Sequence, residues 1–135
     1  MEPYLAGMKA ADCPFCRPDR ESILESDLCY VLPDKYPVSP GNLLVIPRAH
    51  VGDYFELTPE QQSALWRMVE EVKAWLDREH RPDGFNVGFN VGRAAGQTID
   101  HVHLHVIPRY RGDAEDPTGG VRHVIPGKGN YLKDF

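Results

Sequence analysis

The chain has 135 residues, of which 41% are hydrophobic and 26% are charged, and its formal net charge is -5 at pH 7. This composition predicts a single folded domain over 1–135 with its own core, and it excludes a disordered chain. The negative charge disfavours a nucleic-acid partner, because such binding needs many cationic contacts to phosphates. No stretch has the pattern of a membrane span or a signal peptide, so we expect a cytoplasmic protein without a membrane partner.

Two of the three cysteines form the motif Cys13-Pro14-Phe15-Cys16 near the N-terminus. In a reducing compartment this spacing belongs to half of a metal site, to a redox pair or to chance. A redox pair is expected within a βαβ unit, and the surrounding sequence shows no such unit. The third cysteine, Cys29, lies in a short strand-like run and is expected to be a small buried apolar residue.

Proline and glycine residues divide the rest of the chain into predicted strands and one long helix. Strands are expected at 28–32, 42–46, 85–91 and 101–107, each bounded by these turn residues. One helix among several strands joined by short loops indicates an α+β fold with a mainly antiparallel sheet. The segment from Tyr110 is rich in glycine, proline and charge, and it is interpreted either as an extension of the same domain or as a mobile terminus.

The predicted helix runs from about Pro59 to His80. Thr58 suits the N-cap position, and Gln61 completes a capping box with it. Apolar side chains recur at the spacing of one helical face and predict a stripe that is buried in the core. The residues of this stripe are Leu65, Met68, Val69, Val72, Trp75 and Leu76.

Near the C-terminus, His101, His103 and His105 alternate with aliphatic residues. A strand sends successive side chains to opposite faces, so the three histidines would share one face. Because imidazole suits nucleophilic attack, proton transfer and metal ligation near neutral pH, this alternation indicates a functional site. The opposite face would be buried, and it carries Val102, Leu104 and Val106.

A turn of small residues precedes the three histidines and ends in Gly96, Gln97 and Thr98. Gly96 permits close approach of the backbone to a ligand. Gln97 and Thr98, together with exposed backbone N–H groups, could surround phosphate oxygens near the histidine face. Beside the histidines, this turn is interpreted as a loop that stabilises an oxyanion.

The alternating segment 101–107 resembles the motif of the histidine triad (HIT) family, as do 96–98 before it and 108–109 after it. The strand-like run 43–50, which ends with a proline, a basic residue and a histidine, is also similar to that family. The resemblance implies a HIT-like α+β fold with one long helix and a short N-terminal helical segment. It also implies a homodimer.

The likeness extends from about Cys13 to Tyr131, and the tail 117–122 resembles bacterial members described as diadenosine polyphosphate hydrolases. The resemblance implies a nucleotide hydrolase that acts at an α-phosphate, on dinucleoside polyphosphates or related adenosine nucleotides. Three alternatives stay open: a nucleoside phosphoramidase, an enzyme that removes adenylate from DNA ends, and a non-catalytic nucleotide-binding or interaction module. The acidic balance disfavours the DNA substrate.

The resemblance also assigns roles to the histidines. His103 would be the nucleophile and would form a covalent nucleotidyl-histidine that water later cleaves. His105 and either Gln97 or Thr98 would hold the phosphoryl oxygens as charge shifts, and His101 would position His103. A histidine at position 105, where a uridylyltransferase branch has glutamine, favours hydrolysis over transfer.

Other polar residues match substrate-binding positions of the family. Asn90 falls near the scissile phosphate, and Asp34 falls where relatives hydrogen-bond the ribose hydroxyls. Beside Pro33, Asp34 equally suits the role of a turn residue. Asn42 departs from the family, because some relatives have histidine there, and this departure removes one expected polar contact.

Several bacterial relatives bind zinc through a pair of cysteines and two histidines. The matching residues here are Cys13, Cys16, His50 and His101. They would form a closed, tetrahedral Cys2His2 site for a structural Zn2+ ion, which would tie the N-terminal segment to the sheet and fix His101. The metal would take no part in the chemistry.

Overall fold

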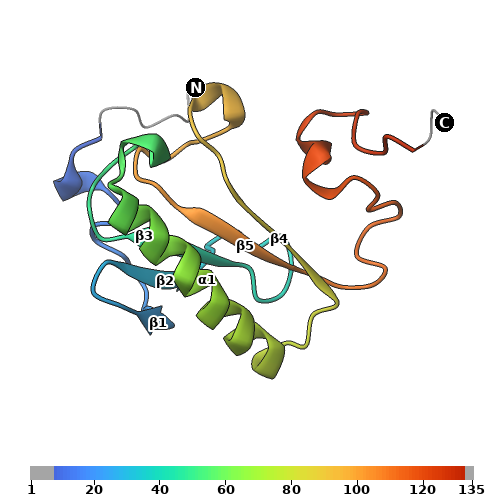
Figure 1. Cartoon of the computed structure of the whole chain (residues 1–135), viewed down its shortest axis with the longest axis horizontal. Helices are drawn as coiled ribbons and strands as arrows, with labels where there is room; N and C mark the ends of the chain where they lie inside the picture. The colour runs from blue at the N-terminus through green and yellow to red at the C-terminus, as the bar shows by residue number, and fades with distance from the viewer. Residues whose placement is uncertain (1–7, 133–135) are drawn as a thin grey trace.

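The computed structural model describes residues 8–132, so the ends of the predicted domain, 1–7 and 133–135, lie outside the described residues. The five strands are Leu24–Glu25 (β1), Cys29–Pro33 (β2), Leu43–Pro47 (β3), Gly84–Phe89 (β4) and Leu104–Arg109 (β5). Neighbouring strands pair antiparallel in the order β1-β2-β3-β5-β4. One long helix, α1, lies across one face of this sheet (Figure 1). The predicted α+β class and antiparallel sheet are confirmed.

The helix α1 spans Pro59–Glu79 and begins as predicted. The Thr58 side chain accepts from the backbone N–H of Gln61 at 3.1 Å, and the Gln61 side chain accepts from the backbone N–H of Thr58 at 2.9 Å. These two bonds satisfy donors that the first turn leaves unpaired. The predicted apolar stripe is confirmed: Leu65, Met68, Val72 and Leu76 are buried, and Val69 and Trp75 pack against them in part.

Four short 3-10 turns complete the secondary structure of residues 8–132. They are Ala10–Asp12 (η1), Tyr54–Glu56 (η2), Arg93–Ala95 (η3) and Gly120–Val124 (η4). The first of them is the predicted N-terminal helical segment, reduced to a single turn.

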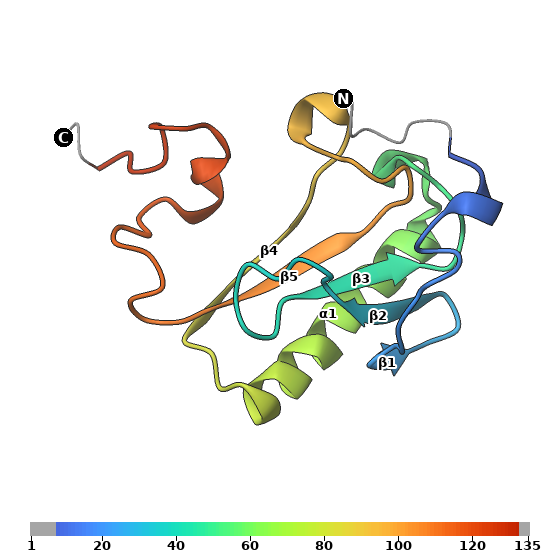
Figure 2. The ribbon, with the colours of Figure 1, turned by 180° about the vertical axis from the view of Figure 1, so that it is seen from behind.

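The sheet has apolar side chains buried on both faces. The face under α1 carries the residues that were predicted to be buried, among them Cys29, Val102, Leu104 and Val106. The opposite face of β2 and β3 is covered by the N-terminal segment that contains Cys13 and Phe15 (Figure 2). Cover on both sides explains why every residue of β3 is buried. It also explains why this strand reads as a continuous apolar run.

The predicted strand 101–107 begins later than expected, because β5 starts at Leu104. The backbone N–H of Val102 donates to the carbonyl of Val51 at 2.8 Å, so this stretch is bonded to the segment after β3 and not to a strand ladder. His101 and His103 therefore precede the strand. The two-residue strand β1 was not predicted, since it is too short to show an alternating pattern.

After β5 the chain leaves the sheet and forms a loop beside β4 (Figure 1). Hydrogen bonds within the loop close it: Asn130 Nδ2 donates to Asp116 Oδ2 at 2.7 Å, and the His123 Nε2–H donates to the carbonyl of Thr118 at 2.8 Å. Among the helices of residues 8–132, none has both the length and the apolarity that crossing a membrane requires.

Candidate active site

His103 is buried immediately before β5, and the backbone sets the orientation of its ring. Its Nδ1 lies 2.8 Å from the carbonyl oxygen of His101. Because a carbonyl can only accept, the proton resides on Nδ1 and the lone pair is on Nε2. Burial lowers the pKa of His103 to about 4, so the imidazole is neutral at pH 7. A neutral, oriented imidazole with a free lone pair can act as a nucleophile.

His105 lies next to His103, and their ring centroids are 5.0 Å apart in an edge-to-face arrangement. Its cross-strand neighbour on β4 is Gly88. No atom lies within 4 Å of the position that a Cβ atom at Gly88 would occupy. Within residues 8–132, Nε2 of His105 is the one buried side-chain nitrogen or oxygen without a hydrogen-bond partner. An unpaired buried polar atom is costly, so a hydrogen bond from this nitrogen to a ligand would be favourable.

Asp34 follows β2 and lies near the two imidazoles. Burial lowers the pKa of both His103 and His105, and the negative charge of Asp34 opposes this effect in each case. One carboxylate oxygen, Oδ1, accepts from the backbone N–H of Tyr36 at 2.9 Å. Asp34 is therefore a turn residue, as the sequence allowed, and is also close enough to the histidines to affect their charge.

A second cluster lies around the side chain of His101. Cys13, Cys16, His50 and His101 each offer one ligand atom, and these atoms lie within 4.8 Å of one another. Nδ1 of His101 is 3.3 Å from Sγ of Cys13 and 3.2 Å from Nδ1 of His50, which is 3.2 Å from Sγ of Cys16. The structure thus brings together the four residues that were predicted as metal ligands.

The hydrogen bonds of the two histidines show that this cluster fits a metal. Nε2 of His101 lies 2.7 Å from the carbonyl oxygen of Pro47, and Nε2 of His50 lies 2.8 Å from that of Met8. Both Nε2 atoms therefore carry protons, and the two Nδ1 lone pairs face each other. A cation between them would remove this repulsion, and two sulfur and two nitrogen donors fit a closed tetrahedral site.

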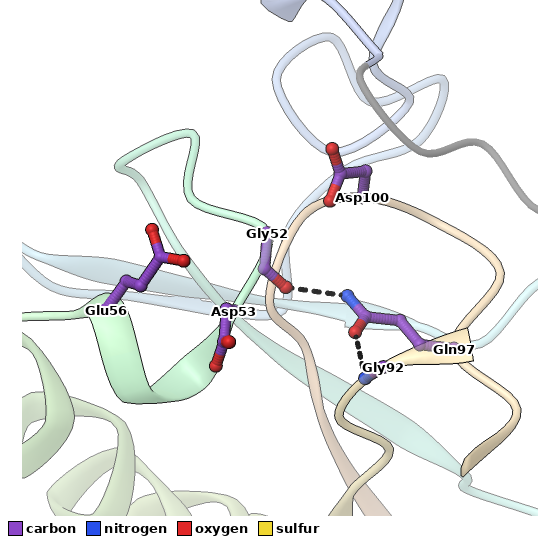
Figure 3. Close-up of a pocket in the computed structure, with 6 residues that line it drawn as sticks. All are labelled: Gly52, Asp53, Glu56, Gly92, Gln97 and Asp100. Atoms are coloured by element: carbon purple, nitrogen blue, oxygen red, sulfur yellow. Dashed lines mark hydrogen bonds between the residues drawn. The ribbon is translucent and has the colours of Figure 1, made fainter. Parts of the chain in front are cut away.

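Gln97 is 4% exposed, and its amide group is engaged within the protein. Nε2 donates to the carbonyls of Gly52 at 2.8 Å and Ile99 at 3.0 Å, while Oε1 accepts from the N–H of Gly92 at 2.9 Å. Two of these three bonds are visible in Figure 3. Both amide hydrogens are therefore used to support the loop, and the predicted contact of Gln97 with phosphate stays a prediction.

The hollow beside Gln97 is acidic. Asp53, Glu56 and Asp100 line it together with backbone of the loop (Figure 3). Their negative charges would repel a polyphosphate, so this hollow does not suit the phosphates of a nucleotide. The side chains of Asn90 and Thr98 are exposed, and their predicted contact with substrate stays a prediction.

Two buried residues make contacts that the sequence did not predict. The ring of Phe15 packs 4.9 Å from that of His103, between centroids, and 5.9 Å from that of His101. Asn42 donates from Nδ2 to the carbonyl of Val106 at 3.2 Å and accepts from the N–H of Val38 at 3.1 Å. An apolar residue inside a cysteine motif and an asparagine after a turn give no local sign of these contacts.

Residues 17–112 match the HIT domain family. The chain is 36% identical over 107 residues to an AP-4-A phosphorylase of Mycobacterium tuberculosis, covering 77% of this chain and 54% of that protein. It is 33% identical over 96 residues to a bis(5'-adenosyl)-triphosphatase of Dictyostelium discoideum, covering 71% and 64%. The chain thus spans little more than half of the first relative and less than two thirds of the second.

The fold also matches solved structures. A crystal structure of a Zn-bound histidine triad family protein from Mycobacterium smegmatis superposes with a TM-score of 0.72 at 31% sequence identity. The match covers 80% of this chain and 82% of that one.

Replacement of Gln97 tests its role in the loop. Gln97→Ala leaves three backbone groups without their partners, and we expect the free energy of unfolding to fall by about 1–3 kcal/mol. Urea denaturation followed by circular dichroism measures this loss. The adjacent exposed variant, Thr98→Ala, is expected to change stability by less than about 0.5 kcal/mol. Unchanged stability of Gln97→Ala would contradict the assignment.

Proposed function

Because the chain belongs to the HIT domain family, we propose that it is a nucleotide hydrolase that works through a covalent nucleotidyl-histidine on His103. The observation that carries the proposal is the juxtaposition of the free lone pair of His103 with the unpartnered Nε2 of His105. The names of the two relatives, an AP-4-A phosphorylase and a bis(5'-adenosyl)-triphosphatase, support dinucleoside polyphosphates or related adenosine nucleotides as the substrate class.

In the first step, Nε2 of His103 forms a bond to the α-phosphorus. The bond from that phosphorus to the bridging oxygen breaks, and the rest of the polyphosphate leaves with both bonding electrons. A phosphoryl oxygen of the substrate would be the missing partner of Nε2 on His105. The developing negative charge would then lie where the protein already has an oriented polar group.

In the second step, a water molecule attacks the α-phosphorus of the adduct. The nitrogen–phosphorus bond breaks, His103 recovers its lone pair, the nucleoside monophosphate leaves and the water releases a proton to solvent. The hydrogen bond from Nδ1 of His103 to the carbonyl of His101 would persist through both steps and would stabilise the positive charge on the ring. Asp34 would bind the ribose hydroxyls, with Asn90 and Thr98 near the phosphates.

Intact-protein mass spectrometry tests the covalent step. Brief exposure to a panel of diadenosine polyphosphates and an adenosine phosphoramidate is expected to add one adenylyl group to the wild-type chain. His103→Ala should show no adduct and no turnover, while His123→Ala, which alters an exposed histidine of the tail, should form the adduct normally. A preference for the phosphoramidate would identify a nucleoside phosphoramidase. Binding of nucleotide with neither adduct nor turnover would indicate a non-catalytic binding module and overturn the proposal.

We propose that the metal bound at Cys13, Cys16, His50 and His101 is zinc. Two thiolates and two imidazoles are typical zinc ligands, and the Zn-bound relative from Mycobacterium smegmatis supports the choice. With four protein ligands the ion would have no open position for a substrate. Its contribution would be to hold the N-terminal segment against His101, and the reaction would be carried by the histidines.

Elemental analysis of gently purified protein is expected to find close to one zinc ion per chain. Cys16→Ser should lose most of this zinc and should unfold at a lower urea concentration, because metal binding is coupled to folding. Cys29→Ala is the matched control: its sulfur lies in the core outside the cluster, so zinc content should be unchanged. A metal-free wild-type protein of full stability would refute the site.

We propose that the chain acts as a homodimer. The resemblance to the family supports this, and β4 is an edge strand of the five-stranded sheet. Light scattering at micromolar concentration should give twice the chain mass of 15.2 kDa. A monomer mass under these conditions would count against the proposal.

A further inference from the structure

Phe15 packs against His103, the imidazole that His105 also contacts. Phe15 is 4% exposed and lies between the two cysteines of the metal-ligand cluster. Its ring contacts the imidazole of His103 at a centroid distance of 4.9 Å with the planes inclined by 58°. His105 contacts the same imidazole at 5.0 Å with an inclination of 62°. Two inclined rings therefore pack against the imidazole of His103: the phenyl ring of Phe15 and the imidazole of His105.

These contacts matter because a single hydrogen bond does not fix a ring. The bond from Nδ1 of His103 to the carbonyl of His101 sets the tautomer but allows the ring to rock about it. Rocking moves Nε2, the atom that must reach the α-phosphorus in line with the leaving oxygen. Small displacements of a reacting atom lower a rate strongly. A packed ring against the imidazole restricts this motion.

Both backbone polar groups of Phe15 are hydrogen-bonded. Its backbone N–H donates to Sγ of Cys13 at 3.3 Å. Its carbonyl accepts from the hydroxyl of Tyr30, a buried residue of β2. The same segment is fixed through Cys13 and Cys16, whose sulfur atoms lie against the ring nitrogens of His101 and His50. The position of the phenyl ring is therefore set by the cluster and by the sheet.

We propose that Phe15 is a positioning residue for the nucleophile: its ring confines the imidazole of His103 to the orientation from which Nε2 attacks. Cys13 and Cys16 flank Phe15 and hold its ring against His103. The metal site and the proposed reactive nitrogen are therefore linked through Phe15 as well as through His101. This inference rests on the proposed function in naming His103 as the nucleophile. Phe15 acts through His103 and is not itself a reacting group.

The test compares Phe15→Leu with Ile46→Val in protein purified with its metal. Phe15→Leu keeps an apolar side chain at the position and removes the flat ring. Ile46→Val is the matched control, since it weakens the same buried cluster without touching the imidazole. Steady-state kinetics on the best substrate of the panel should show kcat of Phe15→Leu lowered about 10- to 100-fold with KM within about twofold. Ile46→Val should retain both constants.

A second measurement does not need activity. Ring 13C relaxation, assigned to His103 by the loss of its signals in His103→Ala, should show a rigid ring in wild type and in Ile46→Val. Phe15→Leu should show ring motion of larger amplitude. If the protein hydrolyses no nucleotide, the proposed function fails while this relaxation still decides the role of Phe15. Wild-type relaxation and wild-type kcat in Phe15→Leu would overturn the inference.

Tyr30→Phe provides a second variant should Phe15→Leu fail to fold. It removes the hydroxyl that donates to the carbonyl of Phe15 and leaves the ring packing of β2 in place. A smaller loss of kcat in the same direction, with a smaller gain in His103 ring motion, supports the inference. Unchanged kcat and unchanged His103 ring relaxation in Tyr30→Phe would overturn it.

Discussion

The hydrogen bond of 2.8 Å from Nδ1 of His103 to the carbonyl of His101 ties the imidazole proposed as nucleophile to a residue that is fixed on several sides. The side chain of His101 is fully buried, donates from Nε2 to the carbonyl of Pro47 and presents Nδ1 to the sulfur of Cys13. A backbone carbonyl cannot move far when its own side chain is held in this way. The placement of the proposed nucleophile therefore follows from the packing of His101, and so does the attachment of the N-terminal segment to the sheet.

Burial decreases along the three histidines in chain order. His101 is 0% exposed and His103 is 9% exposed, while His105 is half-buried and faces the bare backbone of Gly88. The cover is supplied by the N-terminal segment, which packs on β2 and β3 and extends as far as the ring of His103. The imidazole of His103 thus lies at the border between a closed core and an open sheet face. This position combines a neutral imidazole, which burial favours, with access for a ligand, which burial alone would prevent.

The sequence predicted best what depends on local periodicity. The stripe of α1, its capping box and the buried face of Val102, Leu104 and Val106 follow from patterns a few residues long. The start of β5 was misplaced, because the bond from Val102 to Val51 depends on a segment 51 residues away. The meeting of the four metal ligands came from family resemblance, since spacing alone cannot join Cys13 to His101. The contacts of Gln97 and Phe15 depend on backbone groups and rings that are distant in sequence, and no local pattern reports them.

The covalent route through His103 is the central claim, and the stereochemistry at phosphorus tests it most directly. A dinucleoside polyphosphate that is chiral at the α-phosphorus, with one oxygen replaced by sulfur, would be hydrolysed in 18O-labelled water and the configuration of the thiophosphate product determined. Attack by His103 followed by attack by water inverts the configuration twice, so overall retention is the predicted result. Inversion would show that water attacks the substrate directly, and it would contradict a covalent intermediate on His103.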